Sequence, residues 1–297
     1  MPMAEIEGRK VALSNLDKIL YPAAGFTKGE AVHYYASVAD AVLPHLYGRP
    51  VSFLRFPDGV EAQRFFAKHV PPGTPDWVTT CKVHRSGGKT GQQVLIQDLA
   101  SLIWAANLAA LELHTPQWRI ESERQADRIV FDLDPGDGDG ATVLDCRTVA
   151  VWLRERLAED GFTAHPKTSG SKGLHLLAAL VPTDSHAASA YAKTLAREAE
   201  AALPDLALHR MTRSLRAGKV FVDHSQNSWA KTTATPYTLR AKARPTVSTP
   251  VTWEELEAAR TPDDLVFLAS DTPERLQQHG DLLAPLLDPA QARPLPS

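Results

Sequence analysis

The sequence predicts an α/β fold, because apolar runs of strand length alternate with segments that carry helix periodicity and helix caps. The strand-like runs span residues 50–54, 94–97, 128–134 and 219–223. Helical segments lie before and between them, at residues 27–48, 98–111, 142–160 and 185–203, and a further cap stands at Thr252. With 297 residues, of which 43% are hydrophobic, the chain can bury a substantial core.

The N-terminal region carries two capping-box spacings, which predict a short helix after Ser14 and a long one after Thr27. Apolar residues recur at helical spacing through the second helix to Gly48. Phe65 and Phe66 are adjacent, so they cannot share one buried helical face, and the cations around them suit stacking on bases. The residues alone nevertheless favour a core position for this pair.

The middle of the chain begins with a strand that enters a helix capped by Asp98 and apolar on nearly every side. His114 follows that helix, where a lone histidine is typical of a C-terminal cap. The helix over residues 142–160 is closed by Gly161. Cys81 and Cys146 have neither metal-ligand nor disulfide spacing, so we expect both to be small core residues.

Two aspartates, Asp132 and Asp134, end the apolar run over residues 128–134. In a strand, side chains at i and i+2 point to the same face, so these carboxylates would project together. They would repel each other unless a cation lay between them, and hard divalent ions prefer oxygen ligands of this kind. The pattern indicates a metal site for phosphate chemistry, and a solvated Asp-Pro-Gly turn is the alternative.

A small-residue loop, Ser169-Gly-Ser-Lys-Gly-Leu-His175, leads into the next apolar strand. Its backbone amides and Lys172 could cradle a phosphate, although a plain hairpin has the same composition. Farther on, residues 210–250 hold eight basic residues and one acid, Asp223, within a chain of net charge -3. This basic strip could meet a polyanion or be a solvated face.

No stretch reaches the length of an apolar membrane span, and the N-terminus lacks the pattern of a signal peptide. We therefore expect a cytoplasmic protein with no membrane partner.

Taken together, the motifs resemble the archaeo-eukaryotic primase superfamily, whose motifs are Asp-x-Asp, a Ser-x-x-x-x-His type loop and a later single Asp. The similarity is greatest to the polymerase module of bacterial ATP-dependent DNA ligase D and its stand-alone relatives in non-homologous end joining. Its segments are residues 16–22, 114–119, 131–136, 168–175, 214–223, 225–227 and 231–233. They span about residues 10 to 255, most of the chain.

The resemblance implies a mixed, largely antiparallel sheet flanked by helices (an α+β arrangement). It also implies a catalytic domain over residues 1–255, with residues 1–120 as an N-terminal subregion packed on the sheet. Residues 256–297 would then form a C-terminal helix and a loose acidic tail.

The resemblance assigns roles to particular residues. Asp132, Asp134 and Asp223 would be catalytic and would hold two Mn²⁺ or Mg²⁺ ions. The nucleotide-binding residues would be His114, Ser169, Ser171, Lys172, Gly173, His175, Arg216, Gln226 and Arg240, with His114 at the sugar. The DNA-binding residues would be Lys18, Lys28, Arg55, Phe65, Phe66 and Lys68, with both lysines at a 5'-phosphate and the phenylalanines on the template.

The implied activity is a metal-dependent polymerase that adds nucleotides, preferably ribonucleotides, to 3'-hydroxyl ends. Its site of action would be DNA breaks or short gaps with a downstream 5'-phosphate. Nucleoside triphosphates would be substrates, Ku and an ATP-dependent DNA ligase would be partners, and the bacterial nucleoid would be the location. His224 departs from the aromatic residue of several relatives, which bears on the packing behind Asp223.

The sequence leaves two alternative functions open. Phe131-Asp-Leu-Asp134 also opens the nucleophile motif of haloacid-dehalogenase-type phosphatases, in which the first Asp is phosphorylated. That motif usually continues Gly-Thr, whereas Pro135 and Gly136 follow here. A non-catalytic DNA-end-binding module is the second alternative, and the complete acid trio argues against it.

Overall fold

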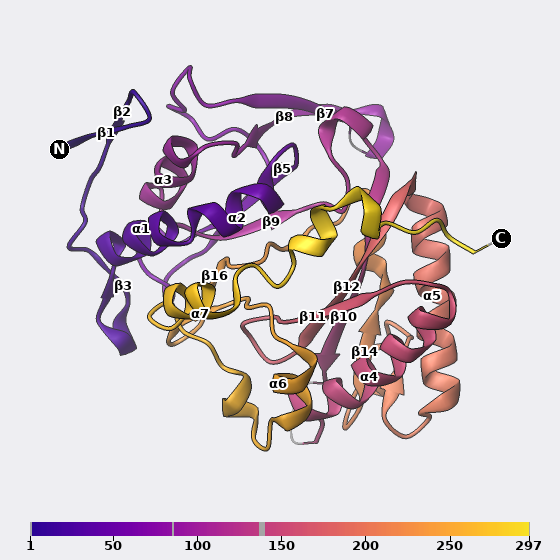
Figure 1. The fold of residues 1–297 in the computed structure, drawn as a ribbon. Helices are drawn as coiled ribbons and strands as arrows, with labels where there is room; N and C mark the ends of the chain where they lie inside the picture. Colours follow the sequence, from indigo (N-terminus) through magenta and orange to yellow (C-terminus); the bar gives the residue numbers. More distant parts are fainter. Residues whose placement is uncertain (1, 85, 137–139, 297) are drawn as a thin grey trace. The chain divides into compact units, whose positions relative to one another are not determined.

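The computed structural model describes residues 2–84, 86–136 and 140–296 of the chain, and its contacts divide the protein into two compact units. Unit 1 comprises Met1–Thr115, Thr232–Ser248 and Phe267–Gly280, and unit 2 comprises Pro116–Lys231, Thr249–Val266 and Asp281–Ser297. Each unit combines helices with a mainly antiparallel sheet (Figure 1). The predicted fold class is confirmed.

Unit 1 is built on a six-stranded sheet in the order β15-β9-β5-β8-β7, with β6 also paired to β5. These strands are β5 (Pro50–Arg55), β6 (Phe65–Ala67), β7 (Thr80–His84), β8 (Thr90–Leu95), β9 (Ala110–Thr115) and β15 (Thr233–Ala234). Three two-stranded pairs complete the unit: β1 (Met3–Ile6) with β2 (Arg9–Ala12), β3 (Ile19–Tyr21) with β4 (Phe26–Thr27), and β16 (Leu239–Ala241) with β17 (Pro245–Val247).

The helices of unit 1 are α1 (Lys28–Ser37), α2 (Ala39–Leu46), α3 (Leu99–Asn107) and α7 (Thr272–His279). The predicted capping box at Thr27 is present, since its side chain accepts from Glu30 N and the Glu30 carboxylate accepts from Thr27 N. The single long helix expected here is interrupted at Val38, where α1 ends and α2 begins.

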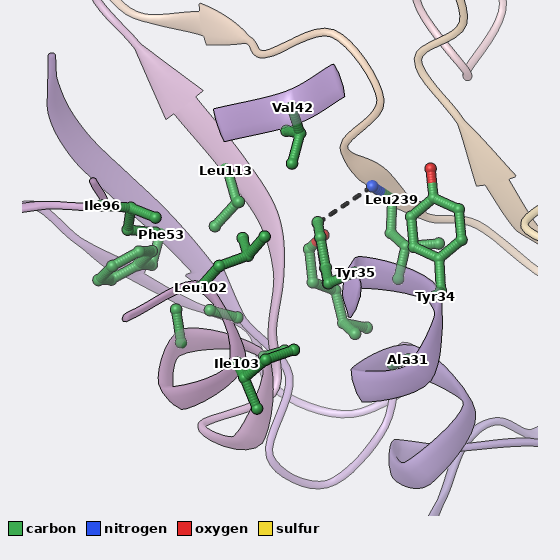
Figure 2. Packing of buried hydrophobic residues seen from close by; sticks show 14 of the residues in the cluster. Ala31, Tyr34, Tyr35, Val42, Phe53, Ile96, Leu102, Ile103, Leu113 and Leu239 are labelled. Carbon is green, nitrogen blue, oxygen red and sulfur yellow. Dashed lines mark hydrogen bonds between the residues drawn. The ribbon is translucent and has the colours of Figure 1, made fainter. Parts of the chain in front are cut away.

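The core of unit 1 gathers around Tyr35 of α1, which packs among side chains from α2, α3 and the sheet (Figure 2). The Tyr35 hydroxyl donates to Leu111 O at 2.6 Å and accepts from Leu239 N at 3.2 Å. Burial raises the pKa of this phenol above its ordinary value. The hydroxyl thus satisfies backbone groups inside an otherwise apolar cluster.

The predicted helix after Ser14 is wrong. Asn15 has a left-handed φ of 50°, and the next regular element is strand β3. Leu16 O and Lys18 O accept from Gly29 N and Lys28 N at the start of α1, so these carbonyls bond across the chain rather than along it. The spacing of a capping box does not by itself produce a helix when the backbone carbonyls that follow it accept hydrogen bonds from another segment.

Unit 2 is built on a five-stranded sheet in the order β11-β12-β10-β14-β13. The strands are β10 (Gln125–Pro135), β11 (Ala164–Thr168), β12 (Leu174–Asp184), β13 (Ala207–Leu208) and β14 (Val220–Asp223), and only the β13–β14 pair is parallel among them. The helices are α4 (Val143–Glu159), α5 (Ser185–Ala202) and α6 (Trp253–Ala258). Both α4 and α5 contact β10 and each other (Figure 1).

Short 3-10 turns link these elements. In unit 1 they are η1 (Pro22–Ala24) and η2 (Ser86–Gly88); in unit 2 they are η3 (Ile120–Ser122), η4 (Arg213–Leu215), η5 (His224–Asn227), η6 (Pro262–Leu265), η7 (Ala284–Leu287) and η8 (Pro289–Gln291).

Helix α4 follows its prediction closely. Thr142 caps it, and Val149, Leu153 and Leu157 are fully buried, as their spacing indicates. Cys146 on the same helix is buried, whereas Cys81 in β7 is partly exposed, which corrects its assignment to the core.

The C-terminal segment differs from the loose tail that we expected. Leu283 and Leu286 are buried against Val130, Leu177 and Ala179 of the unit 2 sheet. Residues 256–297 are also divided between the two units, as are residues 1–120. Local acidity and proline content gave no sign of this packing, because it depends on two leucines meeting distant strands.

Asn227 ties η5 to the middle of β10. Its Oδ1 accepts from Val130 N at 2.8 Å, and its Nδ2 donates to Val130 O at 2.7 Å and to His224 O at 2.9 Å. Replacing Asn227 with alanine leaves these backbone groups without that partner inside the protein. We expect the free energy of unfolding to fall by about 2–4 kcal/mol in denaturant titration. Gln278→Ala, at an exposed site in α7, should cost below about 0.5 kcal/mol. Equal losses in the two variants would contradict the bridging role of Asn227.

Candidate active site and DNA-contact residues

Asp132, Asp223 and His175 lie in one row across three neighbouring strands of unit 2. In the sheet register, Asp132 of β10 is directly opposite Asp223 of β14 on one side and His175 of β12 on the other. Directly opposed residues project to the same face of a sheet, and Asp134 joins that face two positions along. The intervening Leu133 points to the other face, where its carbonyl accepts from the Cys146 thiol of α4.

Each of these carboxylates is turned toward a partner of its own. Asp132 Oδ1 lies 3.3 Å from His175 Nε2, and Asp134 Oδ1 lies 3.7 Å from Lys172 Nζ. Asp223 accepts from Ser225 N at 2.8 Å and from Gln226 Nε2 at 3.1 Å. Among the described residues, no group of three or more His, Cys, Asp or Glu side chains is arranged so that it could hold a metal ion.

The loop between β11 and β12 is folded around Ser169. Ser169 Oγ accepts from the backbone N–H groups of Ser171 and Gly173, both at 3.1 Å, and Ser169 N donates to Gly173 O at 2.9 Å. The strands that it joins are antiparallel neighbours, so the loop closes a hairpin. The hairpin and phosphate-cradle interpretations are therefore compatible, because the same loop places Lys172 beside Asp134.

Arg216 adds a second cation to the acid face. Its guanidinium stacks on Phe221 at 3.7 Å from the ring centroid and donates to Met211 O at 3.0 Å. Phe221 is directly opposite Asp134 in the sheet register, so the stacking holds Arg216 on the face that carries the acids.

The sequence did not single out Lys167, which extends the row by one strand. It lies on β11 directly opposite His175 and is 1% exposed. In the sequence, Lys167 stands between Pro166 and Thr168 before a loop, where a lysine is ordinarily exposed. Its burial on the face that carries the acids follows only from the strand pairing.

His114 and Arg240 belong to unit 1, where a buried carboxylate joins them. Glu112 Oε2 lies 2.8 Å from His114 Nε2 and 3.2 Å from Arg240 Nε, and Glu112 Oε1 accepts from Ala241 N at 3.0 Å. Burial alone would raise the pKa of Glu112, but the His114 hydrogen bond and the Arg240 charge outweigh it and lower the pKa to about 2. His114 lies within strand β9, so its interpretation as a helix cap is wrong.

Lys18 and Lys28 are neighbours in unit 1. Lys28 is 6% exposed and its Nζ donates to Ser14 Oγ at 3.1 Å, while Lys18 Nζ pairs with Asp58 Oδ1 at 2.7 Å. Burial, followed by the charge of Lys18, lowers the pKa of Lys28. An anion bound beside these two cations would relieve their mutual repulsion.

Phe65 and Phe66 are both exposed in β6, at 45% and 56%, so the core position favoured by the residues alone is wrong. Arg55 is directly opposite Phe65 on β5, and its Nε donates to Leu108 O at 3.1 Å. Lys68 Nζ lies 5.5 Å from the ring centroid of Phe66. An exposed aromatic pair flanked by cations has the composition of a base-stacking surface.

Comparisons with known proteins show the family to which the chain belongs. The family model "LigD, primase-polymerase domain" matches residues 27–283. The multifunctional non-homologous end joining protein LigD of Mycolicibacterium smegmatis is 45% identical over 281 residues, which is 93% of this chain and 36% of that protein. The bifunctional LigD of Bacillus subtilis is 30% identical over 91% of this chain and 43% of that protein. The chain thus spans little more than a third of the first relative's length.

Among solved structures, the polymerase domain of Mycobacterium tuberculosis ligase D in complex with DNA aligns with a TM-score of 0.87 and 44% identity. The alignment covers 95% of this chain and 99% of that chain. None of these findings favours the haloacid-dehalogenase alternative. The described residues include no helix long and apolar enough to cross a membrane. On the family model and the 45% identity, the chain belongs to the LigD primase-polymerase domain family.

Proposed function

We propose that the chain is a primase-polymerase that adds nucleotides, preferably ribonucleotides, to 3'-hydroxyl ends at DNA breaks or short gaps. The observation that carries the proposal is the row formed by His175, Asp132 and Asp223, with Asp134 on the same face. Membership of the family supports nucleotidyl transfer as the reaction. The DNA complex of the M. tuberculosis domain supports DNA as the polymer to be extended.

The family is metal-dependent, and the residues of this chain fit a hard divalent ion. Asp132, Asp134 and Asp223 offer carboxylate oxygens from adjacent strands, the donor type that Mg²⁺ and Mn²⁺ prefer. We assign these three residues as ligands of two such ions. When bound, the ions would lower the pKa of the attacking 3'-hydroxyl and neutralise charge on the leaving diphosphate.

The remaining residues would bind and orient the nucleotide. In unit 2, the loop from Ser169 to Gly173 offers backbone amides, and Lys172 and Arg216 offer cations for the triphosphate. Ser171, His175 and Gln226 complete this group, the last by orienting the Asp223 carboxylate. His114 and Arg240 are assigned to the sugar and to a phosphate. Charge stabilisation and positioning would supply most of the rate.

The direct test is nucleotide incorporation by the purified chain on a labelled primer in gapped DNA. Ribonucleotides and deoxyribonucleotides are compared with Mn²⁺ and with Mg²⁺. We expect template-directed extension and faster incorporation of ribonucleotides. Phosphate release from small phosphomonoesters without extension would support the phosphatase alternative, and DNA binding without extension would support the non-catalytic one.

Lys28 gives a narrower prediction. If Lys18 and Lys28 hold a downstream 5'-phosphate, Lys28→Ala should reduce the preference for a 5'-phosphate gap over a 5'-hydroxyl gap by about tenfold, because a charge-assisted contact is lost. Extension of a simple primer should change little. Steady-state incorporation on the matched gaps measures the ratio.

Lys10→Ala, at an exposed lysine of β2 in the same unit, serves as the control. If both lysine variants retain the full preference for a 5'-phosphate, the assignment fails.

The curated relatives are named as proteins of non-homologous end joining. We accordingly propose that the chain works on broken or gapped DNA at the bacterial nucleoid, with Ku and an ATP-dependent DNA ligase as partners. The exposed Phe65 and Phe66, with Arg55 and Lys68 beside them, are proposed to contact the template.

A further inference from the structure

Glu112 occupies an unusual place for a carboxylate. It stands in β9 between two buried leucines and is itself 5% exposed. Three groups converge on it: the imidazole of His114, the guanidinium of Arg240 and the backbone N–H of Ala241. A buried carboxylate is costly unless donors and cations compensate it, and these groups provide that compensation.

The environment keeps Glu112 ionised. Its pKa of about 2 means that the side chain is a carboxylate at neutral pH, which can accept hydrogen bonds but cannot donate one. His114 Nε2 lies 2.8 Å away and must therefore carry a hydrogen. In the neutral imidazole, Nδ1 is then the acceptor nitrogen.

This tautomer suits one kind of ligand group. An imidazole with an Nδ1 acceptor can receive a hydrogen bond from a hydroxyl, whereas the opposite tautomer would present N–H at that position. A ribose carries a 2'-hydroxyl that can donate, and a deoxyribose has none. A fixed acceptor would thus distinguish the two sugars.

The same carboxylate also holds Arg240. Glu112 Oε2 lies 3.2 Å from Arg240 Nε, and Glu112 Oε1 accepts from Ala241 N. The positions of the Arg240 side chain and of strand β16 therefore both depend on Glu112. The Tyr21 hydroxyl donates to Arg240 O at 3.2 Å and so also contacts that strand.

We infer that Glu112 is a positioning residue that fixes the tautomer of His114 and the place of Arg240, and so sets the preference for a ribose over a deoxyribose. The inference rests on the proposed polymerase function, in which His114 meets the sugar and Arg240 a phosphate.

The test is Glu112→Gln, which keeps the shape but replaces an obligate acceptor with an amide that can donate or accept. The ratio of kcat/KM for a ribonucleotide to that for the matching deoxyribonucleotide should fall by about tenfold. Ribonucleotide incorporation should lose more than deoxyribonucleotide incorporation. In a His114→Ala background, Glu112→Gln should change the ratio by less than about twofold, because the group that it orients is absent.

Asp98→Asn is the matched control in the same unit. It also converts an acid to its amide and removes an ion pair, with Arg9, while asparagine remains a good cap for α3. The ratio of the two sugars should stay within about twofold of wild type in this variant. A Glu112→Gln ratio equal to that of Asp98→Asn would overturn the inference.

A measurement on the unaltered protein covers the case in which Glu112→Gln does not fold. Imidazole ¹⁵N chemical shifts, with His114 assigned by its loss in His114→Gln, should report the neutral Nε2–H tautomer. An Nδ1–H tautomer or a doubly protonated ring would overturn the inference, because neither leaves Nδ1 as an acceptor. If the wild-type chain incorporates no nucleotide at all, the proposed function fails instead, so the two failures are distinguishable.

Discussion

Replacing Asp132 or Asp223 with alanine is expected to lower nucleotide incorporation by on the order of a thousandfold or more, because each change removes a ligand oxygen from the proposed ion site. The two residues face each other across β10 and β14, so both variants damage the same place. The loss should appear in kcat more than in KM for the nucleotide, since positive groups such as Lys172 and Arg216 remain to bind the triphosphate.

The measurement is single-turnover extension of a labelled primer with saturating Mn²⁺. Asp205→Ala, at an exposed aspartate of unit 2, controls for the loss of one negative charge and should retain wild-type activity. Thermal unfolding of each variant checks that the sheet is intact, and a gel-shift assay checks that DNA binding is kept. Full activity in either Asp132→Ala or Asp223→Ala would refute the assignment of the acid row.

Gly173→Ala is expected to have the second largest effect, through packing rather than charge. A Cβ atom at this position would lie 2.1 Å from Leu133 O, a backbone atom of β10 that cannot rotate away. The strands would have to separate between Asp132 and Asp134. We expect a loss of about 3 kcal/mol or more in the free energy of unfolding. Incorporation should also fall at temperatures where the variant remains folded, because the loop from Ser169 to Gly173 and the acids no longer keep their register.

Gly161→Ala provides the contrast in a denaturant titration. Gly161 has open space around it but a φ of +82°, so alanine there suffers backbone strain without a clash. That strain costs about 1–2 kcal/mol. If Gly173→Ala lowers the free energy of unfolding no more than Gly161→Ala does, the close approach of residue 173 to Leu133 O does not exclude a side chain there.

Local signals in the sequence were sufficient for much of this fold. The helical spacing of Val149, Leu153 and Leu157 and the closing Gly161 predicted α4, because these signals depend only on residues within a few turns. The i, i+2 spacing likewise predicted that Asp132 and Asp134 share a face of one strand, and the structure places both in β10. Features of this kind can be predicted because the residues that determine them are close together in the sequence.

Features that depend on contacts between residues far apart in the sequence could not be predicted. Glu112 lies just after the helix expected over residues 98–111, and no residue near it in the sequence indicates that Arg240 pairs with it. Ser14 has the spacing of a helix cap, yet the carbonyls after it bond to the start of α1. Each of these outcomes was decided by tertiary contacts that no local window contains.

The row from Lys167 to Asp223 also bears on how the chain can vary in length. One residue inserted into β10 between Arg128 and Asp132 would turn both acids to the helix-covered face, because side chains alternate along a strand. The register already shifts between Ala126 and Arg128, so an insertion before that point could be absorbed there. Natural homologues should therefore gain or lose residues outside the segment from Arg128 to Pro135 and conserve its length.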